Sequence, residues 1–477
     1  MSVAFAEPGP FDGAALAFVS RARAAGGVRR RLSGAYLLPD ALAEPARRAG
    51  LRPSDAGPQT GAQADAAKGD VLPPPPPRIA LYRGAAVGYP YWAYYAHALL
   101  SVGLVPEPVD AEAILAGALD RADCLVMPGG FATWGLDRAE QRAHLDAAVR
   151  SFIDGGGAYV GSCGGAYYAS SGRPGWLDAF PLTPRYTQEY LSTGAGLVSV
   201  RLGSHALAQG LPPAIEMPYY HGPVYDRPDW PAAEDGPAVA GAFRSLVAPS
   251  RLFIDNPLSA ERFAEMADRP AILARRDVGG RFVVFSPHPE MGEFVRKGIA
   301  LDGYVRHYLP IRGTKVMDET LRFYMADESA GFRLIANAVD WLCPQGARGE
   351  AGDRPAPAHD PLDRLDPLVA CGLAALDRLA RQETAEMEGL VRRQAEALSE
   401  EWARLRDPLA TASGRSAAAI VAVLDAAADD AGPDFETRFA GARLAEALVL
   451  CELPVRLASV ARRCLLLDAQ IAEGSHA

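Results

Sequence analysis

Residues 158–167 read AYVGSCGGAY, and this stretch decides the fold. Its first residues form a short apolar run that is typical of a buried strand, and the glycines after it indicate a sharp turn into a helix. Cys163 stands at that turn, in the pattern Gly-x-Cys-x-Gly. Such a turn leaves its central residue in a strained backbone conformation and presents its side chain as a nucleophile. The N-terminal end of the following helix is expected to favour the thiolate.

The sequence on both sides alternates between strand and helix patterns. Short apolar runs at 79–82 and 124–127 predict two more buried strands, and helical spacing predicts helices over 89–103 and 138–154. This alternation is typical of a parallel sheet with helices on both faces, so we expect an α/β fold. Further on, the pattern predicts strands at 196–202 and 239–243, a hairpin of 271–276 with 281–285, and a helix at 331–343.

A second motif supplies the partners that a cysteine nucleophile needs. His288-Pro289-Glu290 comes shortly after the strand predicted at 281–285. The imidazole of His288 would accept the thiol proton, and the carboxylate of Glu290 would orient the imidazole. Parallel strands end at one edge of their sheet, so we expect His288 to meet Cys163 there. The alternative is that His288 is a histidine satisfied within the core.

Two glycines are candidates for stabilising an oxyanion. Met127-Pro128-Gly129-Gly130 ends another predicted strand at the same edge, and Gly164 follows the cysteine directly. The amide N–H groups of Gly130 and Gly164 are expected to form the oxyanion hole. An ordinary tight turn is the alternative interpretation of Pro128–Gly130.

Composition excludes several classes of protein. The 477 residues carry a net charge of −10, with 49% hydrophobic and 22% charged residues, which argues against wholesale disorder and against nucleic-acid binding. No apolar run predicts a transmembrane helix, and the first residues lack the pattern of a secretory signal. The six cysteines form no CxxC pair, and the histidines show no HExxH spacing. We therefore expect no metal, no cofactor and a cytoplasmic location.

Composition also divides the chain into five parts. Residues 1–50 predict a helical extension with one helix from about 13 to 25, and residues 51–77, which end in five prolines, predict a linker. Residues 78–345 contain the motifs described above. A polar linker at 346–360 precedes 361–477, where the apolar spacing predicts a separate bundle of three or four helices. Pro408, Gly432-Pro433 and Pro454 are expected to break or kink these helices.

The motifs resemble those of the class I glutamine amidotransferases, which use a Cys-His-Glu triad. The similarity is closest to the amidotransferase-like domain at the N-terminus of eukaryotic biotin–protein ligases. It covers about residues 78–345 and is carried by Leu81–Gly84, Met127–Gly130, Gly161–Tyr168 and Tyr219–Tyr225. The resemblance implies a flavodoxin-like three-layer αβα sandwich with a mostly parallel sheet. No segment resembles the catalytic domain of a biotin ligase, so ligase activity is not implied.

One position departs from the pattern of the glutaminases. Their cysteine motif usually continues to a Gln that helps to hold glutamine, and Tyr167 stands at that position here. The resemblance therefore does not carry glutamine over as the substrate. The candidates for substrate binding are Tyr167, Gly84, and the pair Tyr220 and His221. A loop packed under the edge of the sheet is the alternative interpretation of that pair.

Together these features predict a cysteine-nucleophile amide (C–N) hydrolase, or an amidotransferase-like enzyme, that works through a thioester intermediate. Its substrate would be a small-molecule amide or a γ-glutamyl compound. Ammonia transfer would require a partner synthetase subunit, because no synthetase domain is recognisable in the sequence. The alternative is a non-catalytic amidotransferase-like module for ligand binding or scaffolding, with residues 361–477 forming homo-oligomers.

Overall fold

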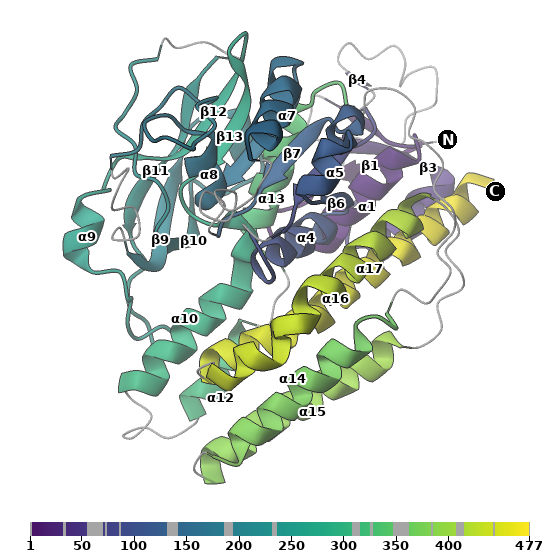
Figure 1. Cartoon of the computed structure of the whole chain (residues 1–477). Coiled ribbons are helices and arrows are strands. Elements are labelled where there is room, and N and C mark those ends of the chain that lie inside the picture. The colour runs from purple at the N-terminus through teal and green to yellow at the C-terminus, as the bar shows by residue number, and fades with distance from the viewer. Residues whose placement is uncertain are drawn as a thin grey trace.

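A nine-stranded sheet forms the centre of the molecule (Figure 1). The structure is a computed structural model. It describes residues 2–31, 35–54, 70–71, 74–84, 87–130, 142–185, 194–230, 236–307, 315–324, 328–346, 362–382, 385–406, 415–441 and 444–476.

Five strands of the sheet run parallel and hold the motifs found in the sequence. In spatial order they are β13 (Gly280–Phe285), β8 (Ala158–Ser162), β7 (Cys124–Met127), β5 (Ile79–Tyr82) and β6 (Pro106–Val109). Every residue of β5, β7 and β8 is buried, as expected for parallel strands that helices cover on both faces.

Four strands extend the sheet beyond β13 with antiparallel pairing. They are β12 (Pro270–Asp277), β11 (Ala238–Leu246), β9 (Ala195–Leu202) and β10 (Ala214–Tyr220). The predicted hairpin is confirmed, because β12 pairs with β13 across a tight turn at 278–279. The sequence did not predict β10, because Glu216 and Pro218 interrupt its apolar run. A proline is tolerated there because β10 is an edge strand.

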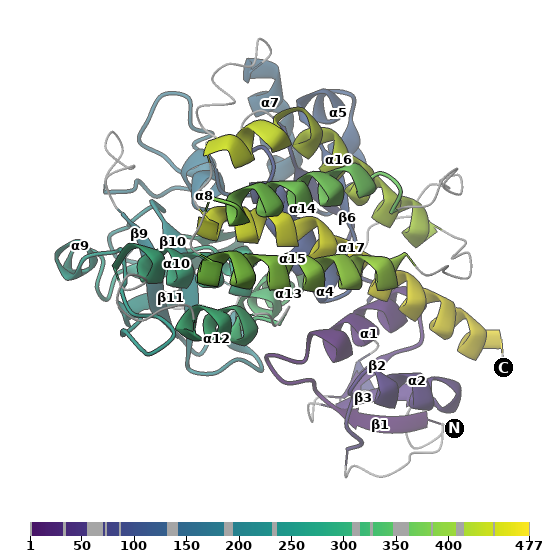
Figure 2. The same cartoon turned by 90° about the horizontal axis from the view of Figure 1, so that it is seen from below.

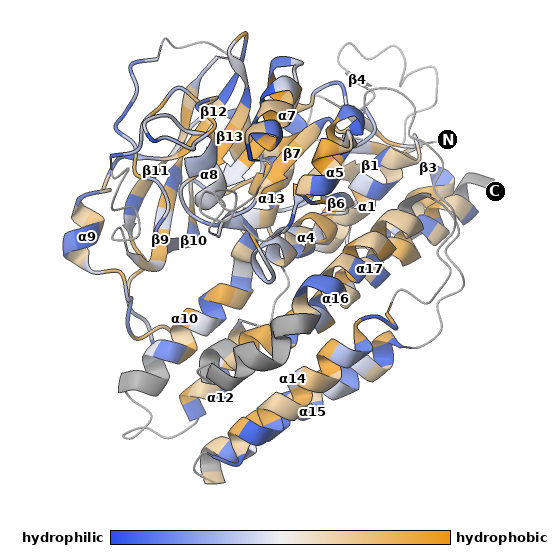
Figure 3. Cartoon of the chain, viewed as in Figure 1, coloured by the Kyte–Doolittle hydropathy of each residue, from blue (hydrophilic) through white to orange (hydrophobic). Residues whose placement is uncertain are grey.

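Helices cover both faces of the parallel strands, so the predicted α/β sandwich is confirmed. The helices that pack on the sheet are α4 (Tyr91–Ser101) and α13 (Ala330–Leu342), together with α5 (Ala111–Leu115) and α7 (Arg142–Asp154). In α7, Leu145, Val149 and Ile153 are buried at helical spacing while the opposite side is solvated. Figure 3 shows this contrast between the orange strands and the mixed colours of α7.

Residues 1–50 are not the purely helical extension that we expected. The predicted helix is present as α1 (Gly13–Ala24), followed by a short 3-10 turn at Asp40–Leu42 and by α2 (Ala43–Arg48). A separate antiparallel sheet accompanies them, in the order β1 (Ser2–Ala6), β3 (Ala35–Pro39), β2 (Arg29–Arg31) and β4 (Asp70–Val71). These strands escape prediction because they are short and because β2 is three arginines. Most of the linker predicted at 51–77 lies outside the described residues.

Two helices that the sequence did not predict follow β13. They are α10 (Gly292–His307) and α12 (Lys315–Phe323), and they pack against each other. Because α10 starts directly after the His-Pro-Glu motif, it connects the candidate site to the C-terminal helices.

The C-terminal part consists of four long helices, α14 (Asp366–Ala380), α15 (Ala385–Leu405), α16 (Arg415–Gly441) and α17 (Leu444–His476). They lie side by side in Figure 2. We expected a separate bundle, but α17 packs against α4 and α10, and α16 packs against β6. One continuous apolar core joins these helices to the sheet.

The prolines in this region do not interrupt the helices as expected. Gly432-Pro433 lies inside α16 and Pro454 inside α17. Leu453 and Val455, on either side of Pro454, are completely buried, and this burial outweighs the backbone hydrogen bond that a proline removes. Pro408 and almost all of the linker predicted at 346–360 lie outside the described residues.

Candidate active site

Cys163 occupies a strained turn at the end of β8. It caps α8 (Gly164–Ala169) with φ 48° and ψ −104°. A residue other than glycine in such a conformation costs about 1–3 kcal/mol, so the surrounding structure must hold it there. The Cys163 amide donates a hydrogen bond of 2.9 Å to the Phe285 carbonyl at the end of β13. The turn therefore joins two neighbouring parallel strands.

The glycines around Cys163 are required for close packing against the end of β7. A Cβ on Gly165 would lie 2.0 Å from the Met127 carbonyl oxygen, and one on Gly164 would lie 2.3 Å from the Gly130 carbonyl oxygen. The structure therefore brings Gly130 and Gly164 together next to the cysteine. Neither amide donates a hydrogen bond to another described residue.

His288 and Glu290 form a buried pair after β13. The His288 Nδ1 atom lies 2.6 Å from Glu290 Oε1, and both residues are only 1% exposed. The His288 amide donates to the Pro218 carbonyl of β10, which fixes the start of the motif. The N-terminus of α13 closes over it, since a Cβ on Gly331 would lie 2.3 Å from the Pro289 carbonyl oxygen.

Gly129 shows that the side chains of Cys163 and His288 are neighbours. A Cβ at this glycine would lie 2.4 Å from His288 Cε1 and 3.4 Å from Cys163 Cβ. Burial lowers the pKa of His288, but the negative charges of Glu290 and of a Cys163 thiolate outweigh burial and raise that pKa to about 10. The Nε2 atom of His288 makes no well-aligned hydrogen bond with the described residues. The Cys163 thiol instead donates to the Tyr220 carbonyl at 3.0 Å.

Tyr220 and His221 also lie at this site. The Tyr220 ring meets the His288 ring edge-on, with 6.0 Å between the ring centroids. His221 follows with a positive φ of 51°, and its Nδ1 accepts a hydrogen bond of 3.1 Å from the Gly194 amide. Burial, and then the charge of His288, lower the pKa of His221. The loop thus borders Cys163 and His288.

Two other predicted binding residues are placed differently. The Tyr167 ring is buried against Trp176, with 5.4 Å between the centroids, in a small aromatic cluster. Gly84 lies after β5 at the same edge of the sheet. Val87, a few residues after Gly84, reaches Gly130, because a Cβ on Gly130 would lie 3.5 Å from the Val87 carbonyl oxygen. Among the described residues, no contact joins Gly84 to Cys163 itself.

No sequence motif indicates a role for Tyr95, which lies beneath the site. This residue of α4 is completely buried, and its hydroxyl is hydrogen-bonded to the hydroxyl of Ser162, immediately before the cysteine. Burial and the charge of Glu290 raise the pKa of Tyr95 well above its usual value. Its helical spacing pointed only to a core residue, and no local motif marks its contact with β8.

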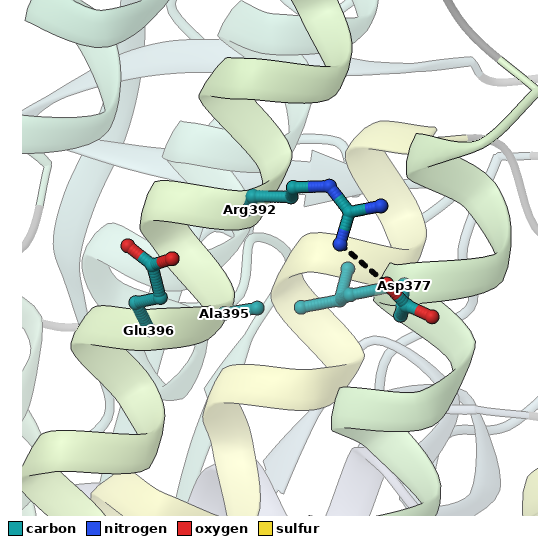
Figure 4. Close-up of a pocket in the computed structure, with 5 residues that line it drawn as sticks. Asp377, Arg392, Ala395 and Glu396 are labelled. Atoms are coloured by element: carbon teal, nitrogen blue, oxygen red, sulfur yellow. Dashed lines mark hydrogen bonds and ion pairs between the residues drawn. The ribbon is translucent and has the colours of Figure 1, made fainter.

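The described residues contain no group of three or more His, Cys, Asp or Glu side chains that could hold a metal ion. None of the helices within the described ranges is long and apolar enough to cross a membrane. Figure 4 shows a pocket of about 110 Å³ between α14 and α15, where Arg392 pairs with Asp377 at 2.7 Å. The C-terminal helices alone form this pocket.

Comparisons with known proteins agree with the resemblance found in the sequence. Residues 104–173 match the sequence model of a family described as "Biotin-protein ligase, N terminal". The matched segment contains β7, α7, β8 and Cys163. This segment is therefore similar to part of the N-terminal domain of biotin–protein ligases. No curated protein matches the sequence.

Several solved structures are similar to this chain, at low identity and low TM-score. A glutamine amidotransferase from Thermotoga maritima is 12% identical, with 55% of this chain and 98% of that chain covered and a TM-score of 0.32. A glutamine amidotransferase from Methylobacillus flagellatus is 14% identical, with 58% and 99% covered and a TM-score of 0.34. A putative ThuA-like protein from Bacteroides uniformis is 14% identical, with 57% and 93% covered and a TM-score of 0.30.

Proposed function

We propose that this protein hydrolyses a carbon–nitrogen bond, or transfers the nitrogen released, with Cys163 as its nucleophile. The observation that carries the proposal is the contact at Gly129, where the cysteine turn and the His288–Glu290 pair meet. A strained cysteine, an oriented imidazole and two amides without acceptors are the groups that acyl transfer requires.

The reaction follows from the role of each group. The Cys163 sulfur attacks the carbonyl carbon of an amide or γ-glutamyl substrate, and the amides of Gly130 and Gly164 stabilise the resulting oxyanion. His288 gives a proton to the leaving nitrogen, the carbon–nitrogen bond breaks, and a thioester and an amine or ammonia form. A water molecule gives a proton to His288 and attacks the thioester, which releases the carboxylic acid and the thiol.

The imidazolium of His288 is the main stabiliser of a thiolate in this arrangement. Because its pKa is raised to about 10, His288 carries its proton at neutral pH and holds it ready for the leaving group. The helix that follows Cys163 is only six residues long, so its dipole contributes less than the sequence pattern suggested.

Two extensions of this proposal concern partners and location. Transfer of ammonia rather than its release would require a partner synthetase subunit. A cytoplasmic location, where thiols stay reduced, is compatible with a catalytic cysteine and with the free cysteines among the described residues.

Site-resolved alkylation tests the proposal, and Cys371 provides an internal control. Cys163 is 8% exposed, whereas Cys371 is half-buried and more accessible. If exposure alone governed reactivity, Cys371 would react first with iodoacetamide. We expect Cys163 to react at least tenfold faster near pH 7, and the H288Q variant to lose this advantage. Mass spectrometry of the labelled peptides measures both rates, and the glutamine analogue 6-diazo-5-oxo-norleucine then tests for a glutamine substrate.

The alternative is a non-catalytic module for ligand binding or scaffolding. It is favoured by the small exposed fraction of Cys163 and by the hydrogen bond of its thiol to the Tyr220 carbonyl. Labelling of Cys163 that is slower than labelling of Cys371 would support this alternative and contradict the proposed enzyme.

A further inference from the structure

We propose that His221 is the specificity residue of this site and donates a hydrogen bond from Nε2 to an oxygen of the acyl substrate. The inference rests on the proposed function and assigns the substrate a carbonyl or carboxylate oxygen beside the bond that Cys163 attacks. Three independent features of the loop carry it: its position, its backbone conformation and the tautomer of the ring.

The position of His221 is fixed by the nucleophile itself. The carbonyl of the preceding residue, Tyr220, accepts a hydrogen bond from the Cys163 thiol, and the Tyr220 ring lies against His288. His221 is therefore one residue from a direct contact with the sulfur. It is half-buried, so its side chain remains partly open to solvent at the same edge of the sheet.

The backbone at His221, like that at Cys163, has a positive φ. Its φ of 51° is uncommon for a residue other than glycine, asparagine, aspartate or histidine, and non-glycine residues in such conformations concentrate at functional sites. A reciprocal pair of hydrogen bonds with Gly194 holds it: the His221 amide donates to the Gly194 carbonyl at 2.8 Å, and the Gly194 amide donates to Nδ1 at 3.1 Å. The next residue, Gly222, fixes the exit of the turn, because a Cβ there would lie 1.8 Å from the Ser286 carbonyl oxygen.

The bond from Gly194 also determines the tautomer of the ring. Nδ1 is an acceptor, so the proton of the neutral imidazole is on Nε2, which makes that atom a donor. Burial and the nearby charge of His288 keep the ring neutral by lowering its pKa. No acceptor for Nε2 is found in the part of the chain that the structure describes. A fixed donor near a cysteine nucleophile suits an oxygen of the substrate.

Charge variants at position 221 test whether the side chain faces the bound acyl group. Iodoacetamide and iodoacetate deliver the same alkyl group to Cys163 but differ in charge, so the ratio of their rates cancels the fraction of thiolate. We expect H221R to raise the iodoacetate-to-iodoacetamide ratio by about 3–10-fold, because a cation within several ångströms attracts the anionic reagent. H221N is the neutral reference, since asparagine tolerates a positive φ.

His205 supplies the matched control. It also accepts a backbone hydrogen bond at Nδ1, from the Leu207 amide at 3.2 Å, but it belongs to a turn outside the candidate site. The same substitution, H205R, should leave the ratio unchanged. In H221G, which preserves the backbone conformation without a donor, alkylation by iodoacetamide should slow about 3–10-fold, and H221N should restore part of the rate.

The outcomes separate this inference from the proposed function. A ratio in H221R equal to that in H221N overturns the role of His221, although Cys163 remains the reactive thiol. If Cys163 reacts no faster than Cys371 in the unaltered protein, the proposed function fails, and this inference fails with it. The iodoacetate-to-iodoacetamide ratio of the unaltered protein is then compared with that of a free thiol. A higher ratio in the protein indicates that the site prefers a carboxylate oxygen, and a lower ratio indicates that it prefers a neutral carbonyl oxygen.

Discussion

At the residue scale, Gly129 sets the separation between Cys163 and His288. Its φ is not in the left-handed region, so alanine is allowed by the backbone and only space is at issue. The added methyl would lie 2.4 Å from His288 Cε1, and the buried ring must move to accept it. We expect G129A to slow the alkylation of Cys163 at least tenfold, and to cost about 1–3 kcal/mol of the free energy of unfolding through overpacking.

The matched control for this change is G203A. A Cβ at Gly203 meets only carbonyl oxygens at 3.6 Å, an ordinary contact, so both reactivity and melting temperature should stay as in the unaltered protein. Rapid alkylation of Cys163 in G129A would show that the imidazole does not need this position.

Glu290 determines the protonation of His288. Substitution E290Q keeps an acceptor for Nδ1 but removes the charge, so the pKa of His288 should fall from about 10 toward or below its usual value. Titration of the ring nitrogens by NMR measures this shift directly. A His288 that titrates near pH 6.5 in the unaltered protein would contradict the arrangement.

The same pKa predicts how stability depends on pH. The pKa of His288 is higher in the folded than in the unfolded protein, so its contribution to stability is complete below about pH 6.5 and is lost as the pH rises through about 10. Chemical denaturation should therefore show the stability difference between the unaltered protein and E290Q shrinking as the pH rises from about 6.5 to about 10. A difference that grows with pH would have the wrong sign.

At the scale of elements, the sequence predicts what local patterns encode. β7 and β8 were predictable because every residue in them is apolar or small. That Cys163, His288 and Glu290 lie near one another was predictable because their motifs follow the ends of parallel strands. The strand β10 and the contact of Tyr95 with Ser162 were not, because an interrupted edge strand and a contact between distant elements leave no periodic pattern. Pro454 lies inside α17 and does not end it, because the tertiary packing of the residues on either side stabilises the helix.

The connection between α10 and α17 is a buried ion cluster. Lys297 of α10 pairs with Glu452 of α17, which also accepts a 3.0 Å hydrogen bond from Arg456. Burial favours the neutral form of Glu452, but both cations outweigh burial and lower its pKa. Substitution E452Q would remove the carboxylate that pairs with the buried Lys297, while Arg456 keeps its ion pair with Glu401 at 2.7 Å. We expect it to cost about 3–5 kcal/mol of the free energy of unfolding.

A double variant tests whether that loss comes from the unpaired charge. Replacing both Lys297 and Glu452 by methionine removes the charges together, and should recover much of the stability that E452Q loses. The exposed pair of Arg201 and Asp268 is the control, and R201A should change the denaturation midpoint little. If E452Q is as stable as the unaltered protein, the ion cluster does not hold α10 to α17.

At the scale of the whole molecule, the C-terminal helices complete the core of the α/β part. Leu453, Val455 and Leu457 of α17 are completely buried within the apolar core that includes α4 and the sheet. Two polar contacts reinforce this packing: Arg21 of α1 pairs with Asp468 at 2.7 Å, and Arg83 after β5 pairs with Asp430 of α16 at 2.5 Å. Removing these helices would expose a large apolar surface on the remaining domain.

We therefore expect a chain ending at residue 346 to aggregate or to melt without cooperativity, rather than to fold as a free amidotransferase-like domain. A gentler test places a protease site between residues 347 and 360 and cleaves the folded protein. Because the two parts share one core, they should stay together in size-exclusion chromatography, and Cys163 should keep its reactivity toward iodoacetamide. Separation of the fragments, each with its own cooperative melt, would show instead that the helices form an independent domain, as their sequence alone suggested.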